Sequence, residues 1–379
     1  MPPVNLLTKP ASSACNMRCR YCFYHAIAEA RETAFEGMLS DEMLERLIRS
    51  GMEYADGLCS FAFQGGEPTL AGLPFYKKAV ALQKKYARDG LAVSNALQTN
   101  GLAIDEEWAR FLHDEHFLVG LSLDGPAELH DRNRVDADGK GTWSRVMRAA
   151  RLFDRFGVEY NVLCVVTGGN AKSIEKIYRF YRRQGFRYLQ FIPCLEPLEQ
   201  ERGSEPYHLS VRAYGDFLIR IFDLWYADFV RGDYVSIRHL DNWLLLALGQ
   251  PPEACNMCGR CSIQFVVEGD GGVYPCDFYV YDQWRLGALG ERPLAELAAC
   301  DTAKRFLEAS HPVPAQCRAC RWGALCRNGC RRDRVPQQNG DAPLNFYCEA
   351  VRAFFSARET QFMDAARLAA RRRADAAPH

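Results

Sequence analysis

From the start of the chain to about residue 235, short apolar runs alternate with longer amphipathic stretches. The runs have the length and composition of buried strands, and the stretches between them carry apolar residues at helical spacing. The expected strands cover residues 5–9, 60–64, 92–98, 117–123, 160–166 and 188–193. The expected helices cover residues 41–54, 74–88, 106–113, 144–156 and 171–184, and a last helix covers 211–229. Six strand–helix units in series predict an α/β fold whose parallel sheet curls into a full or partial barrel, with the active site at the carboxyl ends of the strands.

Polar and glycine-rich motifs follow four of the expected strands. They are residues 15–22, Gln64-Gly65-Gly66-Glu67-Pro68, Gln98-Thr99-Asn100-Gly101 and Ser122-Leu123-Asp124-Gly125. Because the ends of parallel strands meet at one edge of a sheet, we expect these motifs to converge on one site.

Beyond about residue 250 the pattern changes to cysteine pairs, glycines and short segments. A hairpin is expected over residues 264–274, turning at 269–272. These features predict a second, metal-stapled domain. We therefore expect a barrel domain over residues 1–235, a second domain over 236–358, and a tail over 359–379 that is rich in Ala and Arg and forms a surface helix fraying into disorder.

The charge balance points to no polyanionic partner. Lys plus Arg and Asp plus Glu both number 47 in a chain of 379 residues, so no global field favours nucleic acid or an anionic membrane. No apolar run approaches the roughly 18 residues that a membrane span needs, and no secretion signal precedes the first strand. We expect a soluble, cytoplasmic protein.

Sixteen cysteines in such a protein favour metal binding over disulfides, because cytosolic thiols are kept reduced. Three of them lie close together near the start, and eleven fall between Cys194 and Cys348. Four stand apart from the tight groups and are expected to be small core residues. These four are Cys59, Cys164, Cys194 and Cys300.

The first group, Cys15, Cys19 and Cys22, has the spacing Cx3Cx2C. Three cysteines on a four-iron cluster leave one iron open to a substrate, as open positions mark catalytic metal sites generally. The alternative is a zinc site that borrows a fourth ligand such as His25.

This loop, followed by Gly65-Gly66-Glu67-Pro68, resembles the radical S-adenosylmethionine (SAM) superfamily. The resemblance implies a [4Fe-4S] cluster on the three cysteines whose open iron is chelated by SAM. It also implies cofactor contacts from five residues: Tyr21, Gly66, Ser122, Arg134 and Leu195. Two purely structural alternatives stay open: the two glycines could form only a turn, and Arg134 could lie on a solvated face.

The later cysteines resemble the SPASM extension of peptide-modifying radical enzymes. The resemblance implies two further [4Fe-4S] clusters, each fully bound by the protein and suited to electron transfer. One would be held by Cys255, Cys261, Cys276 and Cys330, and the other by Cys317, Cys320, Cys326 and Cys348. Cys258 is an extra candidate that could replace Cys255, and on spacing alone zinc remains an alternative.

Over about nine tenths of its length the chain resembles the anaerobic sulfatase-maturating enzymes, for example in residues 61–70 and 273–279. These enzymes oxidise a cysteine or serine of an unfolded sulfatase to formylglycine through a 5'-deoxyadenosyl radical. The resemblance implies an electron donor such as flavodoxin or ferredoxin, and it makes Asp277, next to Cys276, the candidate base. A turn-capping role is the alternative for Asp277.

Four residues are weaker candidates for holding the substrate peptide: Tyr24, Gln64, Gln98 and Arg238. Two rival functions remain. One is another SPASM enzyme that forms thioether or carbon–carbon crosslinks, although the first strand begins within ten residues of Met1 and is expected to leave no room for an added peptide-recognition domain. The other is a non-enzymatic electron carrier or zinc scaffold. The choice between cysteine and serine as substrate stays open.

Overall fold

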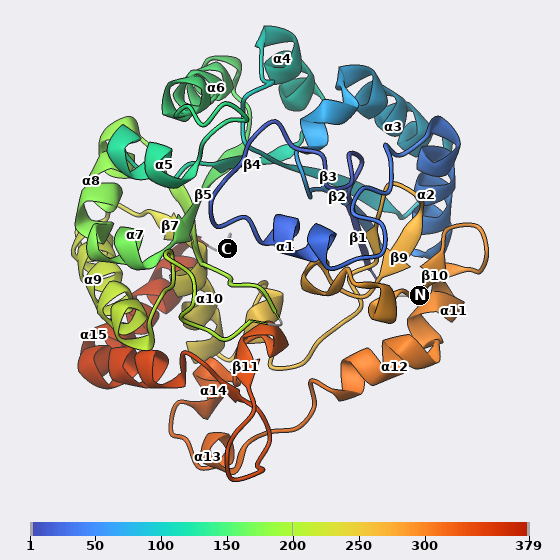
Figure 1. Ribbon diagram of the computed structural model, residues 1–379. Helices are drawn as coiled ribbons and strands as arrows, with labels where there is room; N and C mark the ends of the chain where they lie inside the picture. Colours follow the sequence, from blue (N-terminus) through green and yellow to red (C-terminus); the bar gives the residue numbers. More distant parts are fainter. Residues whose placement is uncertain (1–2, 199, 377–379) are drawn as a thin grey trace. The chain divides into compact units, whose positions relative to one another are not determined.

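The structure is a computed structural model that describes residues 3–198 and 200–376 (Figure 1). The chain divides into two compact units. Unit 1 contains the chain up to Leu123, His130–Asn161 and Ser262–Leu307, and unit 2 contains Asp124–Leu129, Val162–Cys261 and the chain from Glu308 onward.

The sheet of unit 1 is built on four parallel strands: β1 (Val4–Thr8), β2 (Leu58–Phe63), β3 (Ala92–Thr99) and β4 (Leu118–Ser122). They confirm the first four expected strands to within two residues at each end. The strand order in this unit is β10-β9-β8-β1-β2-β3-β4. The chain therefore leaves β1, β2, β3 and β4 at the same edge, where the polar motifs follow.

A hairpin from late in the sequence extends this sheet beyond β1. Its strands are β8 (Val266–Val267) and β9 (Gly272–Tyr274), and β10 (Gly287–Ala288) follows. β8 runs antiparallel to β9, which confirms the expected hairpin, and it pairs parallel with β1 through Thr8 and Val267. The segment that carries Asp277 is thus brought to the end of the first strand.

Amphipathic helices cover the strands of unit 1. In α2, the Ser40 side chain caps the first turn by accepting from the Met43 N–H, and Leu44, Leu47 and Ile48 are buried. Figure 1 shows α2 and α3 on the outer side of β1 to β3. The helices of unit 1 are α1 (Phe23–Glu29), α2 (Asp41–Tyr54), α3 (Leu73–Lys85), α4 (Glu106–Asp114), α6 (Trp143–Phe156), α11 (Leu294–Ala299) and α12 (Asp301–Glu308), whose last residue belongs to unit 2. α5 (Ala127–Asn133) has residues in both units.

The fifth and sixth expected strands are β5 (Tyr160–Val166), which belongs to unit 2 from Val162 onward, and β6 (Tyr188–Pro193) of unit 2, and both have the expected bounds. They are parallel, and β7 (Ser236–Ile237) follows β6. The helix expected over 171–184 is divided at Ser173 into α7 (Gly168–Lys172) and α8 (Ile174–Gln184). The other elements are α9 (Val211–Val230), α10 (Arg238–Ala247), α13 (Ala315–Arg318), α14 (Gly323–Cys326), α15 (Cys348–Ala376), and the antiparallel pair β11 (Arg334–Val335) and β12 (Leu344–Asn345).

The C-terminal helix α15 packs along α9, and the two lie side by side in Figure 1. Phe354, Phe355 and Phe362 are buried along it. At a kink in α15, Arg358 makes a two-point ion pair with Asp223 of α9. The helix expected in the tail therefore begins earlier, at Cys348, and part of it is buried rather than lying free on the surface; residues 377–379 of that tail lie outside the described residues.

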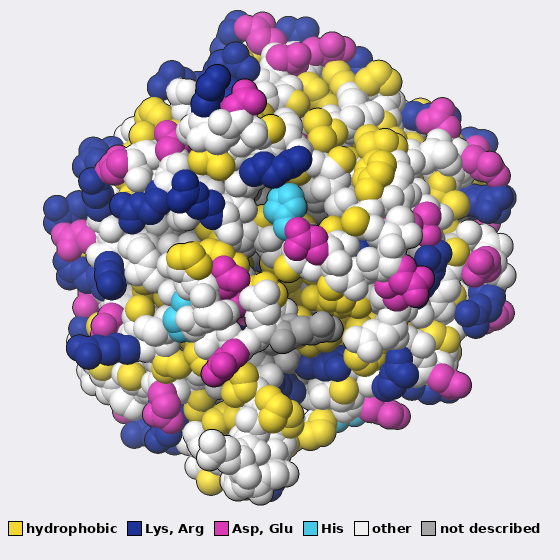
Figure 2. All heavy atoms as spheres, in the orientation of Figure 1, with side chains coloured by type: hydrophobic (Ala, Val, Ile, Leu, Met, Phe, Trp, Pro, Cys, Tyr) yellow, Lys and Arg dark blue, Asp and Glu magenta, His cyan; other side chains and the backbone are white. Residues whose placement is uncertain are grey.

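Charged side chains of both signs are interspersed over the face shown in Figure 2. This agrees with the equal numbers of basic and acidic residues. Within the described residues, no helix combines the length and apolar character that crossing a membrane requires.

Candidate active site and cluster-binding cysteines

The first cysteine group occupies the loop between β1 and α1. Cys22 precedes α1 as its N-cap and donates its N–H to the Cys19 carbonyl at 3.1 Å. The Cys15 thiol accepts from the Met17 N–H at 3.4 Å. Burial raises the pKa of Cys15 to about 11, and the charge of the nearby Cys22 adds to the shift. The two thiols thus lie within electrostatic reach of each other on one short loop.

Backbone hydrogen bonds fix this loop against the segment that carries Arg134. The Arg18 N–H donates to the Val135 carbonyl at 2.8 Å, and the Arg20 N–H donates to the Asn133 carbonyl at 2.9 Å. Arg134 lies between these partners, is buried, and holds its guanidinium 5.4 Å from the centre of the Tyr21 ring. The fold brings these two predicted cofactor contacts together, and the alternative of a solvated face for Arg134 is wrong.

Gly65 and Gly66 allow the next loop to approach the cysteine loop closely. Both have positive φ angles, +93° and +53°. A Cβ on Gly66 would come within 2.3 Å of the Ala14 carbonyl oxygen, and one on Gly65 within 2.6 Å of Cγ of Lys9. Such distances exclude a side chain, so the motif is more than an ordinary turn.

Glu67 joins its own motif to residues 98–101 and to Ala14, which directly precedes Cys15. One of its carboxylate oxygens, Oε1, accepts from the Thr69 N–H and hydroxyl and from the Thr99 hydroxyl, and the other accepts from the Asn100 N–H at 2.8 Å. Its own N–H donates to the Ala14 carbonyl. Burial raises the pKa of Glu67, while these hydrogen bonds act in the opposite direction.

Asn100 completes the link to the cysteine loop. Its amide donates to Asn16 Oδ1 at 2.7 Å and lies 3.9 Å from the Cys15 sulfur. The Gln98 amide donates to the Ser122 hydroxyl at 3.1 Å, so the third and fourth motifs also meet. Within unit 1, the first three motifs and the start of the fourth, Ser122, are thus linked as expected, whereas Asp124 and Gly125 belong to unit 2.

Asp277 lies at the start of a short 3-10 turn, Asp277–Tyr279, directly after Cys276. Its Oδ2 accepts from the Tyr24 hydroxyl at 2.6 Å and from the Gln64 amide at 3.1 Å, and the same amide donates to the Tyr24 hydroxyl at 2.7 Å. Burial and the Asp277 carboxylate raise the pKa of Tyr24 well above its usual range, so its hydroxyl remains a donor at neutral pH. Three of the predicted site residues thus form one hydrogen-bonded cluster.

In unit 2, Cys317 and Cys320 lie within electrostatic reach of both Cys326 and Cys348. Burial raises the pKa of Cys326 to about 11, and the charges of Cys348, Cys317 and Cys320 add to the shift. Burial likewise raises the pKa of Cys348 to about 11, with additions from Cys317 and Cys320. The thiols that influence Cys326 and Cys348 are thus the other members of the predicted donor set of one cluster.

Of the other four predicted ligands, three belong to unit 2 and one, Cys276, belongs to unit 1. Burial raises the pKa of Cys255 to about 11, and the charges of Cys261 and Cys258 raise it further. Because Cys258 influences Cys255 as Cys261 does, it stays a candidate ligand. Cys330, whose sulfur accepts from the Arg332 N–H at 3.4 Å, belongs to unit 2, whereas Cys276 belongs to unit 1.

All sixteen cysteines carry free thiols. Among the described residues, no three Cys, His, Asp or Glu side chains stand close enough to hold a single metal ion. The thiolates of a four-iron cluster bind different iron atoms and are spread more widely than the ligands of one zinc ion. Apart from the four cysteines that stand alone in the sequence, the free thiols are grouped in three stretches of the chain, at residues 15–22, 255–276 and 317–348.

Comparison with known proteins decides the family. The sequence profile of the radical SAM superfamily matches residues 10–181, and that of an iron-sulfur cluster-binding domain matches residues 252–321. The chain is 48% identical over 355 residues to a cysteine-type anaerobic sulfatase-maturating enzyme of Clostridium perfringens (strain 13 / Type A), covering 94% of this chain and 96% of that protein.

The chain belongs to the anaerobic sulfatase-maturating enzyme family. A serine-type enzyme of this family from Bacteroides thetaiotaomicron is 32% identical, covering 93% of this chain and 89% of that protein. The solved structure of native anSMEcpe with bound AdoMet and Cp18Cys peptide matches with a TM-score of 0.92 and 46% identity, over 97% of this chain and 99% of that one. These matches confirm the predicted radical SAM fold with a SPASM domain, its SAM and its iron-sulfur clusters.

Two predicted contact residues of this sulfatase-maturating chain belong to unit 2. Leu195 is half-buried two residues after β6, and Arg238 is exposed at the start of α10. Their roles, like those of the other predicted site residues, stay predictions.

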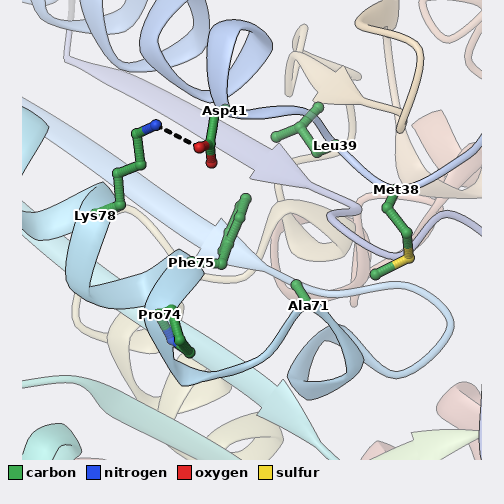
Figure 3. A pocket seen from close by; sticks show the side chains of 7 residues that line it. All are labelled: Met38, Leu39, Asp41, Ala71, Pro74, Phe75 and Lys78. Carbon is green, nitrogen blue, oxygen red and sulfur yellow. Dashed lines mark ion pairs between the residues drawn. The ribbon is translucent and has the colours of Figure 1, made fainter.

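A surface cavity of about 310 Å³ lies between the start of α2 and α3 (Figure 3). Across it, Asp41 and Lys78 form an ion pair at 2.6 Å. Its lining residues are Met38, Leu39, Asp41, Ala71, Pro74, Phe75 and Lys78. None of them is a predicted site residue.

Sequence reasoning missed Lys9, Arg31 and Glu268, which form buried ion pairs beside Asp277. The sequence did carry a signal, because each of two charged residues, Lys9 and Glu268, directly follows an apolar strand. Only the pairing of β1 with β8 brings them together.

Proposed function

We propose that this protein oxidises a cysteine, or with lower efficiency a serine, in an unfolded sulfatase polypeptide to Cα-formylglycine. The observation that carries the proposal is the cluster of Asp277, Tyr24 and Gln64 in a chain of this family. It supplies a carboxylate base next to Cys276. Cysteine is the preferred substrate because the relatives at 44% to 48% identity are cysteine-type enzymes, whereas those at 32% to 36% are serine-type.

The proposal assigns each cofactor to the cysteines and contact residues that the sequence predicts for it. Cys15, Cys19 and Cys22 would hold the cluster that binds SAM, and Tyr21, Gly66, Ser122, Arg134 and Leu195 would contact SAM. The auxiliary clusters would use Cys255, Cys261, Cys276 and Cys330, and Cys317, Cys320, Cys326 and Cys348. When bound, these groups supply the 5'-deoxyadenosyl radical that removes a hydrogen atom from the substrate Cβ, and an acceptor for the second electron.

Asp277 takes the substrate proton in this mechanism. Its Oδ1 atom is buried and faces the Lys9 ammonium. We therefore assign proton uptake to Oδ2, the oxygen that faces Tyr24 and Gln64. Loss of one hydrogen atom, one proton and one electron turns the thiol carbon into a thioaldehyde. Water then replaces sulfur, giving the aldehyde and hydrogen sulfide; a serine gives the aldehyde directly.

The proposal also includes the residues that bind the substrate peptide and the source of the first electron. Tyr24, Gln64, Gln98 and Arg238 are assigned to the peptide, and the bound peptide of the similar anSMEcpe structure supports a peptide substrate. A flavodoxin or ferredoxin would supply the first electron. A cytoplasmic location suits sixteen free thiols, and the domain boundaries at residues 235 and 358 remain part of the proposal.

The test is anaerobic cluster reconstitution followed by incubation with SAM, a reductant and a sulfatase-motif peptide that contains Cys or Ser. Mass spectrometry should show the aldehyde product, with more from the Cys peptide, and methionine and 5'-deoxyadenosine as co-products. No aldehyde from either peptide would overturn the proposal, and a thioether or carbon–carbon crosslink would assign the chain to another SPASM reaction.

A further inference from the structure

A buried row of alternating charges ends at Asp277. Arg31 Nη1 lies 2.7 Å from Glu268 Oε1, and the Lys9 ammonium lies 3.6 Å from the same oxygen. The ammonium is also 3.2 Å from Asp277 Oδ1, in the geometry of an ion pair rather than of an aligned hydrogen bond. Two cations and two carboxylates therefore balance each other in unit 1.

These charges are almost completely removed from water. The side chains of Arg31 and Glu268 are 1% exposed, that of Lys9 is 3% exposed and that of Asp277 is 11% exposed. Buried charges are costly unless they are paired, and removing one member leaves its partner uncompensated. Each member therefore constrains the position of the next.

The ammonium of Lys9 has little freedom to move. Its backbone N–H donates to the Val267 carbonyl at 2.8 Å, and its stem lies against Gly65, where even a Cβ would come within 2.6 Å. The ammonium lies 4.5 Å from the centre of the Tyr24 ring, a favourable distance for a cation over an aromatic face.

The two oxygens of Asp277 are consequently held from opposite sides. Oδ1 faces Lys9, while Oδ2 accepts from Tyr24 and Gln64. We propose that Lys9, anchored by Glu268 and Arg31, is a positioning residue that fixes the rotation of the Asp277 carboxylate and keeps Oδ2 directed at Tyr24 and the substrate. The inference rests on the proposed role of Asp277 as the base.

The test compares Lys9→Ala with Lys77→Ala, a control at an exposed lysine of the same unit that pairs with Glu107. For Lys9→Ala the ratio of formylglycine to 5'-deoxyadenosine should fall at least about tenfold, with the KM for the peptide changed by less than about threefold. n-Propylammonium, which replaces the missing end of the side chain, should restore the ratio, whereas 1-propanol of similar size should not. Lys77→Ala should behave as the wild type.

A second readout does not depend on turnover. Crystal structures of the reconstituted wild type and Lys9→Ala should show the Asp277 carboxylate rotated away from Tyr24 in the variant, and returned by n-propylammonium. Lys9→Met, which keeps the buried stem without the charge, should show the same rotation and replaces Lys9→Ala if that variant does not fold.

The inference is overturned if the carboxylate keeps its position in both variants, or if the product ratio stays at the wild-type value. Recovery by 1-propanol as well as by n-propylammonium would also overturn it, because filling space would then suffice. If the wild type itself forms no formylglycine, the proposed function fails, and the position of the carboxylate alone decides the role of Lys9.

Discussion

Asp277 gains its environment from residues that are remote in the sequence. Tyr24 comes from the start of α1, Gln64 directly follows β2 and Lys9 directly follows β1. The carboxylate was predictable because it follows a cysteine in a motif. Its partners were only weakly predictable, since their meeting depends on strand pairing across more than 200 residues of chain.

Asp277→Asn keeps the size of the side chain and removes the base. Formylglycine formation should fall by about 10² to 10⁴-fold, while cleavage of SAM continues, because the predicted SAM contacts do not include this residue. Product analysis by mass spectrometry measures both. Asp282→Asn, at an exposed carboxylate that accepts only from the Glu32 N–H in the described hydrogen bonds, is the matched control; a wild-type aldehyde yield from Asp277→Asn would exclude the role.

Gly65 is constrained by its contact with Lys9 as well as by its backbone. Gly65→Ala should lower the free energy of unfolding by about 2–4 kcal/mol, from the left-handed φ and the overlap with Lys9. Gly139→Ala is the control, because Gly139 has a similar φ of +77° but no atom within 4 Å of an added Cβ. Denaturant unfolding measures both variants, and equal losses would show that the contact with Lys9 contributes nothing.

At the scale of elements, periodicity alone predicted β5, β6 and α2 with the observed bounds. Two features escaped it. The hairpin was expected, but its attachment to β1 was not, because a two-residue strand such as Val266–Val267 carries no signal for a distant partner. The division at Ser173 also followed no pattern in the apolar residues, since the capping Thr167 starts a separate short helix.

The C-terminal helix α15 should contribute to the stability of unit 2 through its buried face. Phe362→Ala should cost about 3–5 kcal/mol, because the ring is 1% exposed and packs among Phe222 and Phe355. The neighbouring Met363 is 41% exposed, so Met363→Ala should cost less than about 1 kcal/mol. Unfolding by denaturant compares the two, and similar losses would contradict the burial of this face.

At the scale of the whole molecule, the cysteine spacing carried most of the functional prediction. The three groups of cysteines are visible in the local sequence, and family membership then explains why they occur in one chain. In contrast, the positions of Lys9, Glu268 and Arg31 beside Asp277 could be found only from the fold. The central claim is that this molecule directs a radical at the Cβ of a peptide side chain.

That claim is tested most directly with a sulfatase-motif peptide whose cysteine carries two deuterium atoms at Cβ. After anaerobic incubation of the reconstituted protein with SAM and a reductant, mass spectrometry should find deuterium in 5'-deoxyadenosine and one deuterium retained in the formylglycine aldehyde. Unlabelled 5'-deoxyadenosine formed in step with the aldehyde would contradict hydrogen abstraction from Cβ and, with it, the proposed reaction.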